Sequence, residues 1–181
     1  METQVPGGVV SFLRVADRIS IWSGRLAAWL IIPMVGALTF EVVARYFFNK
    51  PTVWAYDVTY MLYGALFMLG AAYTLQRQGH IRTDILYDNW SPRTQGTVDA
   101  LMYVLVFFPT MIAFLYLGWD FFVRSFFRGE RVVSSPWMPV VYPFKAVIPA
   151  TCALLIIQGS AELVRSIWAA RHGVWPPREV E

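Results

Sequence analysis

Two uncharged stretches decide the fold of this chain: VTYMLYGALFMLGAAYTLQ at residues 58–76 and ALMYVLVFFPTMIAFLYLGW at residues 100–119. They contain 19 and 20 residues. A helix that crosses the hydrocarbon core of a membrane needs about 20 mostly apolar residues. Each stretch therefore predicts a transmembrane helix.

Two shorter runs predict two further helices. Residues 26–40 and 146–161 are uncharged over 15 and 16 residues, and charged residues bracket both runs. Such runs reach only about 22–24 Å as helices, but the bracketing side chains can extend to the interface and complete a crossing. The alternative is that they form buried or re-entrant segments. We expect spans at about residues 20–43, 54–76, 99–122 and 144–167.

Composition supports this interpretation. The chain has 181 residues, of which 57% are hydrophobic and 15% charged, whereas soluble domains have about 45–50% apolar and about 25% charged residues. A single cysteine, Cys152, excludes a disulfide scaffold and cysteine-ligated zinc or iron–sulfur sites. The segments between the spans are too short for another domain, so residues 1–181 form a single all-α integral membrane domain.

The distribution of Lys and Arg predicts the orientation. Nine lie in the N-terminal segment, the second loop and the C-terminal segment, and six lie in the first and third loops. The positive-inside rule therefore favours cytoplasmic termini.

The middles of the expected spans lack Asp, Glu, Lys, Arg and His. Ion pumps and proton relays place such residues within the membrane, so an ion path through this chain alone is not expected. Neither histidine, His80 or His172, lies mid-membrane, which argues against a haem bound by two histidines. We expect no enzyme activity, no cofactor, no metal and no nucleic-acid partner.

The ionisable residues gather at the ends of the spans instead. Glu41 and Arg45 are four residues apart, which places them on one helix face. Asp57 follows Trp54 at the start of the second span. Its carboxylate there either interacts favourably with the helix dipole or forms an ion pair with Arg45. Gly79 indicates a helix end, and His80 and Asp84 follow it as solvated loop residues or as a pair that holds the loop against the membrane or a partner.

The other two spans have similar end groups. Their candidate positions are Arg124, Arg128 and Arg131 at the end of the third span, Pro143 and Lys145 at the start of the fourth, and Gln158 and Glu162 near its end. The arginine spacing predicts one basic face, which contacts solvent or lipid phosphates or docks an acidic partner. The four-residue spacing of Gln158 and Glu162 predicts a polar stripe, either structural or joining helices within a complex.

These residues, in this order, resemble a known family, the small membrane subunit of tripartite ATP-independent periplasmic (TRAP) transporters. The resemblance extends from about residue 25 to 168 and rests on Glu41-Val42-Val43-x-Arg45-Tyr46, Pro51-x-x-Trp54-x-x-Asp57, Gly70-Ala71-Ala72, Gly79-His80-Ile81-x-x-Asp84, Tyr142-Pro143-x-Lys145 and Gln158-Gly159. The Tyr-Pro-x-Lys element is most similar to the mannitol/chloroaromatic-type subgroup. The chain departs from the family's Trp-x-Glu-Glu pattern, because Tyr56 replaces the first acid and Asp57 the second.

The resemblance implies a non-catalytic subunit of a three-part complex in the bacterial inner membrane. A periplasmic protein binds an organic acid, and a large permease subunit transports it by a sodium-driven elevator motion. The small subunit packs, among membrane lipids, against the static scaffold of the large one. It also helps to dock the binding protein.

Two other classes of function compete with this interpretation. One is an autonomous homodimeric exporter with Glu41 as its binding carboxylate, although Glu41 lies near a span end and the loops are long for that class. The other is a membrane anchor for a redox enzyme, which the position of the histidines weakens.

Overall fold

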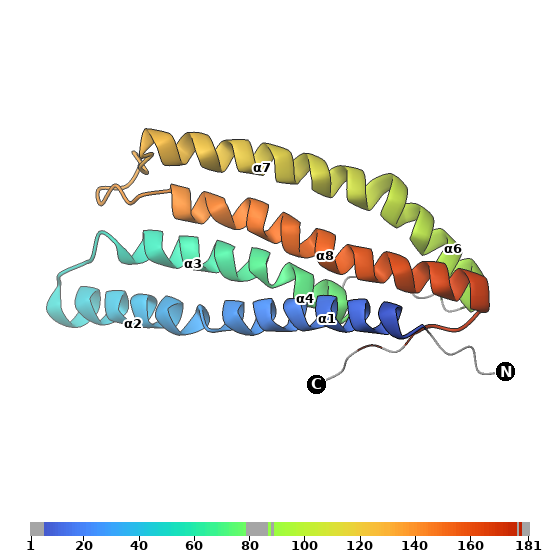
Figure 1. Cartoon of the computed structure of the whole chain (residues 1–181). Coiled ribbons are helices and arrows are strands. Elements are labelled where there is room, and N and C mark those ends of the chain that lie inside the picture. The colour runs from blue at the N-terminus through green and yellow to red at the C-terminus, as the bar shows by residue number, and fades with distance from the viewer. Residues whose placement is uncertain (1–5, 79–86, 88, 177, 179–181) are drawn as a thin grey trace.

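The structure is a computed structural model that describes residues 6–78, 87, 89–176 and 178. Within these residues, all of the long elements are helices (Figure 1). The helices are α1 (Gly7–Ala28), α2 (Ile31–Phe48), α3 (Ala55–Leu69), α4 (Ala71–Gln76), α6 (Pro92–Met102), the π-helical turn η1 (Tyr103–Phe107), α7 (Phe108–Arg128) and α8 (Tyr142–His172).

Four helical stretches are long and apolar enough to cross a membrane, which confirms the all-α membrane fold. They are Gly7–Phe48, Ala55–Gln76, Pro92–Arg128 and Tyr142–His172. Their described lengths of 42, 22, 37 and 31 residues mostly exceed the expected spans. The spans were predicted from the thickness of the hydrocarbon core alone. A helix can continue beyond the core into the polar interface, because polar residues are also compatible with helical geometry.

Prolines explain two of the irregularities along these stretches. The first helix is interrupted at Trp29 and Leu30, because Pro33 has no N–H to donate to the Trp29 carbonyl four residues earlier. The π-helical turn η1 immediately precedes Pro109, which likewise cannot donate to Leu105. A local widening of the helix accommodates the missing hydrogen bond.

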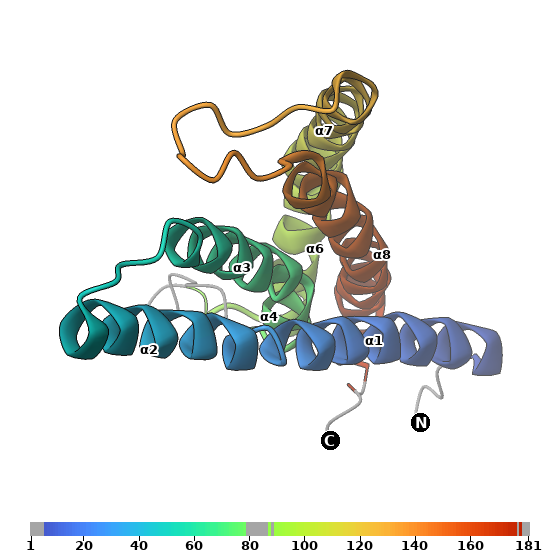
Figure 2. The ribbon, with the colours of Figure 1, turned by 90° about the vertical axis from the view of Figure 1, so that its left-hand side faces the viewer.

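Helix α8 is the centre of the bundle. It contacts α1, α3, α4, α6 and α7, whereas α2 packs mainly on α3. Figure 2 shows that the α1–α2 rod crosses beneath the other helices at a wide angle to α7 and α8. We call the end where α1 begins and α8 ends the termini end, and the end where α2 joins α3 and α7 joins α8 the hairpin end (Figure 1).

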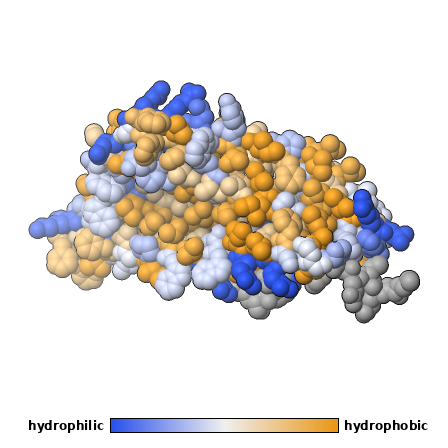
Figure 3. Space-filling view, in the orientation of Figure 1, coloured by the Kyte–Doolittle hydropathy of each residue, from blue (hydrophilic) through white to orange (hydrophobic). Residues whose placement is uncertain are grey.

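The interior contains mainly small and polar residues, and most of the large apolar residues face outward. Ala55, Ala72 and Ala161 are fully buried, whereas Trp29 and Phe127 are 68% and 81% exposed. Apolar residues cover most of the middle of the face in Figure 3, and hydrophilic residues gather towards its edges. Small residues at helix contacts and apolar residues outside are typical of a membrane bundle.

Gly96 gives a direct test of the contact between α6 and α8. A Cβ atom there would lie 2.5 Å from the Ser166 carbonyl oxygen and 2.6 Å from the Ala170 nitrogen. Because these are backbone atoms, we expect Gly96→Ala to lower the free energy of unfolding by about 1–3 kcal/mol. Gly36→Ala is the matched control, since no heavy atom lies within 4 Å of its added Cβ. Thermal unfolding in detergent measures both variants, and equal melting temperatures would refute the described packing.

Candidate functional site

A buried cluster of polar side chains lies at the termini end. We call it the terminal polar cluster; it comprises Asp17 and Ser20 from α1, Gln76 from α4, Gln158, Glu162 and Arg165 from α8, and Arg178 from the C-terminal segment. The α1 and α8 members are between 0% and 3% exposed. Charged groups are this deeply buried only when they are paired.

Arg165 is at the centre of the cluster. Its Nη2 donates to Asp17 Oδ2 at 2.5 Å, and its Nη1 donates to Glu162 Oε1 at 2.7 Å. One guanidinium thus joins a carboxylate of α1 to a carboxylate one turn away on its own helix. The pair with Asp17 joins residues 148 positions apart in sequence.

Gln158 extends these contacts. Its amide nitrogen lies 3.1 Å from both Asp17 Oδ1 and Glu162 Oε1, and its amide oxygen accepts a 2.7 Å hydrogen bond from the Ser20 hydroxyl. The predicted polar stripe of Gln158 and Glu162 therefore exists, but it faces the protein interior.

The C-terminal segment closes the cluster from outside. Arg178 binds both carboxylate oxygens of Glu162, at 2.9 and 2.8 Å, and donates to the Gln76 carbonyl oxygen at 3.0 Å. A two-point guanidinium–carboxylate contact is among the strongest polar contacts in proteins. The segment after α8 is thus fixed to α4 and α8 together.

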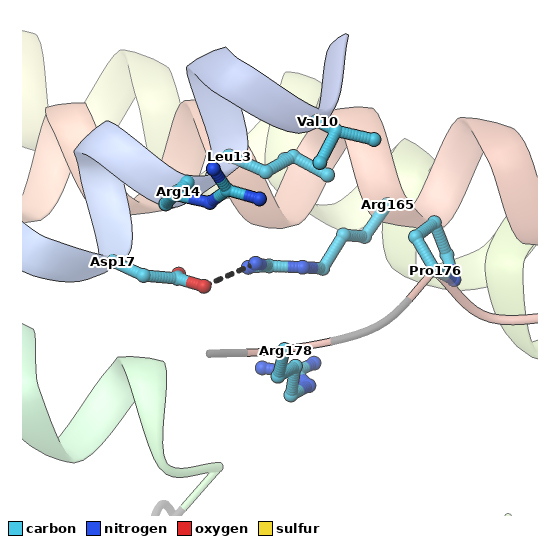
Figure 4. A pocket seen from close by; sticks show the side chains of 7 residues that line it. All are labelled: Val10, Leu13, Arg14, Asp17, Arg165, Pro176 and Arg178. Atoms are coloured by element: carbon cyan, nitrogen blue, oxygen red, sulfur yellow. Dashed lines mark hydrogen bonds and ion pairs between the residues drawn. The ribbon is translucent and has the colours of Figure 1, made fainter. Parts of the chain in front are cut away.

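A cavity of about 160 Å³ lies beside the cluster (Figure 4). Its charged lining residues are Arg14, Asp17, Arg165 and Arg178, and the remaining lining is apolar. The cluster pairs carboxylates with guanidinium groups and contains no nucleophile beside a base, so its geometry suits helix fixation and anion contacts. Within the described residues, no group of three or more His, Cys, Asp or Glu side chains could hold a metal ion.

A second polar site closes the α2–α3 hairpin. Glu41 forms an ion pair with Arg45 and accepts hydrogen bonds from the Thr52 hydroxyl and, at 2.7 Å, from the Thr52 backbone N–H. Trp54 stacks on Phe40 with ring centroids 5.8 Å apart. Glu41 thus fixes the connection between two helices.

Asp57 has a different partner from the one considered above. It accepts a hydrogen bond from the Ser135 hydroxyl in the loop between α7 and α8, whereas Arg45 binds Glu41. The alternative of an Asp57–Arg45 ion pair is therefore wrong, because Glu41 is one helical turn from Arg45 and already occupies it.

Lys145 fixes the same loop from α8. Its ammonium lies 2.5 Å from Glu130 and 3.7 Å from the centroid of the Phe121 ring. Pro143 lies in the first turn of α8, where its missing N–H costs no hydrogen bond.

The three arginines do not share one helical face. Helix α7 ends at Arg128 because Gly129 adopts a left-handed conformation with φ of 56°. Arg131 therefore lies beyond the helix, where it donates to the Met138 carbonyl oxygen at 3.1 Å, and Arg124 pairs with Asp120. The predicted single basic face is wrong, since the spacing argument requires a continuous helix.

Gly79, His80 and Asp84 lie outside the described residues. The sequence argument missed Asp17, Arg165 and Arg178 as members of one cluster. One signal was available: Gln158, Glu162 and Arg165 follow a spacing of four and three residues, which places all three on one face. No local pattern identifies Asp17 or Arg178 as their partners.

The Glu130–Lys145 pair predicts a pH effect. The hydrogen bond from the Lys145 ammonium is the main cause that lowers the pKa of Glu130 below its ordinary value of 4.5. A lowered pKa in the folded state stabilises the protein above the unfolded-state pKa, and this contribution is lost as the pH falls through the folded-state value. We expect Glu130→Gln to lose less stability than the unmodified chain between about pH 5 and pH 3. Melting temperatures across this range test it, and parallel curves would contradict it.

Comparison with known proteins adds an independent result. The model of the family described as "Tripartite ATP-independent periplasmic transporters, DctQ component" matches residues 34–168. The chain is 21% identical over 138 residues to the sialic acid TRAP transporter permease protein SiaT of Haemophilus influenzae, covering 75% of this chain and 22% of that protein. It is 27% identical over 109 residues to the C4-dicarboxylate TRAP transporter small permease protein DctQ of Vibrio cholerae, covering 58% of this chain and 47% of that one.

The matches thus span less than half the length of both relatives. The family model, in contrast, covers most of this chain, from α2 to the last turns of α8. The chain belongs to the DctQ component family of the tripartite ATP-independent periplasmic transporters.

Proposed function

We propose that this chain is a non-catalytic small permease subunit that supports a large TRAP permease subunit in the bacterial inner membrane. The observation that carries the proposal is the family match over residues 34–168, which includes nearly the whole four-helix bundle. Among the described residues, the buried charged groups lie near the two ends of the bundle: Asp17, Glu162 and Arg165 pair with one another at the termini end, and Lys145 pairs with Glu130 at the hairpin end. A large outward apolar surface remains for lipid and for a neighbouring subunit.

The finer parts of the proposal follow from the resemblance and the relatives. The relatives' names specify sialic acid and C4-dicarboxylate, which supports an organic acid as substrate of the complex. The resemblance supports sodium as the driving ion, and the large subunit would carry the coupling, because the uncharged runs of this chain supply no charged side chain in mid-membrane. The mannitol/chloroaromatic-type subgroup stays a prediction that rests on Tyr142-Pro143-x-Lys145.

Orientation follows from charge. The described termini lie at the same end of the bundle (Figure 1), and the nine-to-six distribution of Lys and Arg supports a cytoplasmic position for that end. The hairpin end then faces the periplasm. Arg124, Arg128 and Arg131 lie there and are exposed, so they would contact the periplasmic binding protein.

The experiment that tests the subunit role is a pull-down of the tagged chain from its native membrane in mild detergent, followed by mass spectrometry. We expect a large polytopic permease to be recovered with it in roughly equal amounts. Recovery of the chain only with itself would overturn the proposal and would favour an autonomous homodimer.

The role of Glu41 distinguishes the proposed small subunit from an autonomous homodimeric exporter. Because Glu41 is engaged by Arg45 and Thr52, we expect Glu41→Gln to loosen the α2–α3 hairpin without removing the sodium dependence of uptake. Uptake by the assembled complex, measured with and without a sodium gradient, tests this. A complex that assembles normally but loses sodium dependence would show that Glu41 takes part in coupling.

A further inference from the structure

The cavity beside the terminal polar cluster has an excess of positive charge in its lining. Arg14, Arg165 and Arg178 line it, and Asp17 is the one carboxylate among its described lining residues (Figure 4). Arg14 is exposed and Arg178 is half-buried, whereas Arg165 is fully buried. The cavity therefore has an accessible outer side, and its inner wall contains a guanidinium group that is paired with Asp17 and Glu162.

The inner wall has hydrogen-bonding capacity left. Arg165 uses its two terminal nitrogens on Asp17 and Glu162, but its Nε is buried without a hydrogen-bond partner. Buried donors are normally satisfied. Asp17 is engaged from the protein side, since Oδ1 accepts from Gln158 and Oδ2 from Arg165. Arg165 and Arg178 together balance the charges of Asp17 and Glu162, so the additional cation of the lining is Arg14.

The position of the cavity along the bundle indicates what reaches it. The uncharged run of α8 ends at Ala161, and Arg165 follows one turn later. On α1, Asp17 and Arg18 precede the expected start of the first span at about residue 20. The cavity thus lies just beyond the hydrocarbon level, at the depth of lipid headgroups. Its wall also includes apolar Val10 and Leu13.

We propose that this cavity binds a phosphate group, that of an anionic phospholipid headgroup or of free inorganic phosphate. Arg14 and Arg178 contact the phosphate from the outer side, and Arg165 contributes the unsatisfied Nε donor at the inner wall. Guanidinium groups suit this ligand, because their planar donors match phosphate oxygens. The site is independent of the proposed transporter role, since it needs no other subunit.

The test uses the full-length chain in detergent and native mass spectrometry. Phosphatidylglycerol is added, and a diacylglycerol with the same acyl chains is the control without phosphate. Arg14→Gln removes one cation from the cavity, and Arg18→Gln is the matched control, because it removes the same charge from an exposed position of the same helix outside the lining. Each variant is first shown to be monodisperse with an unchanged helical spectrum.

We expect Arg14→Gln to bind the first phosphatidylglycerol about tenfold more weakly, the size typical of one charge-assisted hydrogen bond, and Arg18→Gln to bind it as the unmodified chain does. A separate arm adds inorganic phosphate. Stabilisation of the unmodified chain against unfolding by inorganic phosphate identifies free phosphate as a ligand. Binding of phosphatidylglycerol without such stabilisation identifies the lipid. Equal binding by Arg14→Gln and the unmodified chain in both arms, or equal retention of diacylglycerol, would overturn the proposal.

Discussion

Arg165→Met is expected to lower the free energy of unfolding by about 3–5 kcal/mol, the cost typical of removing one partner from a buried ion pair. Methionine retains most of the side-chain volume, so the loss comes from charge. Without the guanidinium, Asp17 and Glu162 remain buried at 1% and 3% exposure. Gln158 would still donate to Asp17, and Arg178 would still bind Glu162.

The measurement is thermal unfolding of the purified chain in detergent, monitored by circular dichroism. Arg171→Met is the matched control, because Arg171 lies in the last turn of the same helix and is exposed. The triple variant Asp17→Asn, Glu162→Gln, Arg165→Met removes the uncompensated charges as well, and we expect it to recover much of the loss. Equal melting temperatures for Arg165→Met and Arg171→Met would show that the cluster does not hold the bundle together.

Removing this subunit from the complex is expected to reduce substrate uptake to near the background level. The proposed reason is that the large permease loses its support in the membrane and part of its docking surface, while the periplasmic protein is untouched. Uptake of labelled substrate into cells or vesicles with and without the subunit measures the effect. Binding of the same substrate by the isolated periplasmic protein is measured in parallel.

The control for this experiment is restoration of the subunit in a second copy, which should return uptake to its original level. The affinity of the binding protein for its substrate should not change. Uptake that continues at the original rate without the subunit would contradict the proposed role. Loss of uptake caused only by disappearance of the large subunit would be seen by quantifying that subunit in the membrane.

Several features of the candidate sites could be predicted from short-range spacing. Glu41 and Arg45 pair because residues four apart face the same side of a helix, and Gln158 and Glu162 bond to each other for the same reason. The spacing argument was wrong for Arg131, where Gly129 ends the helix. It gave no means of choosing between partners for Asp57, because Ser135 comes from a loop 78 residues away.

The sequence by itself determined the membrane class, the number of helical spans and their approximate positions, because these depend on local composition and on the fixed thickness of the hydrocarbon. Only the tertiary structure showed that Asp17, Glu162, Arg165 and Arg178 meet in one buried cluster beside a cavity. That meeting depends on how far α1 extends beyond the membrane span, on the crossing of α1 and α8, and on the return of the C-terminal segment. These are long-range packing relations, and residues 148 positions apart leave no periodic signal of their contact.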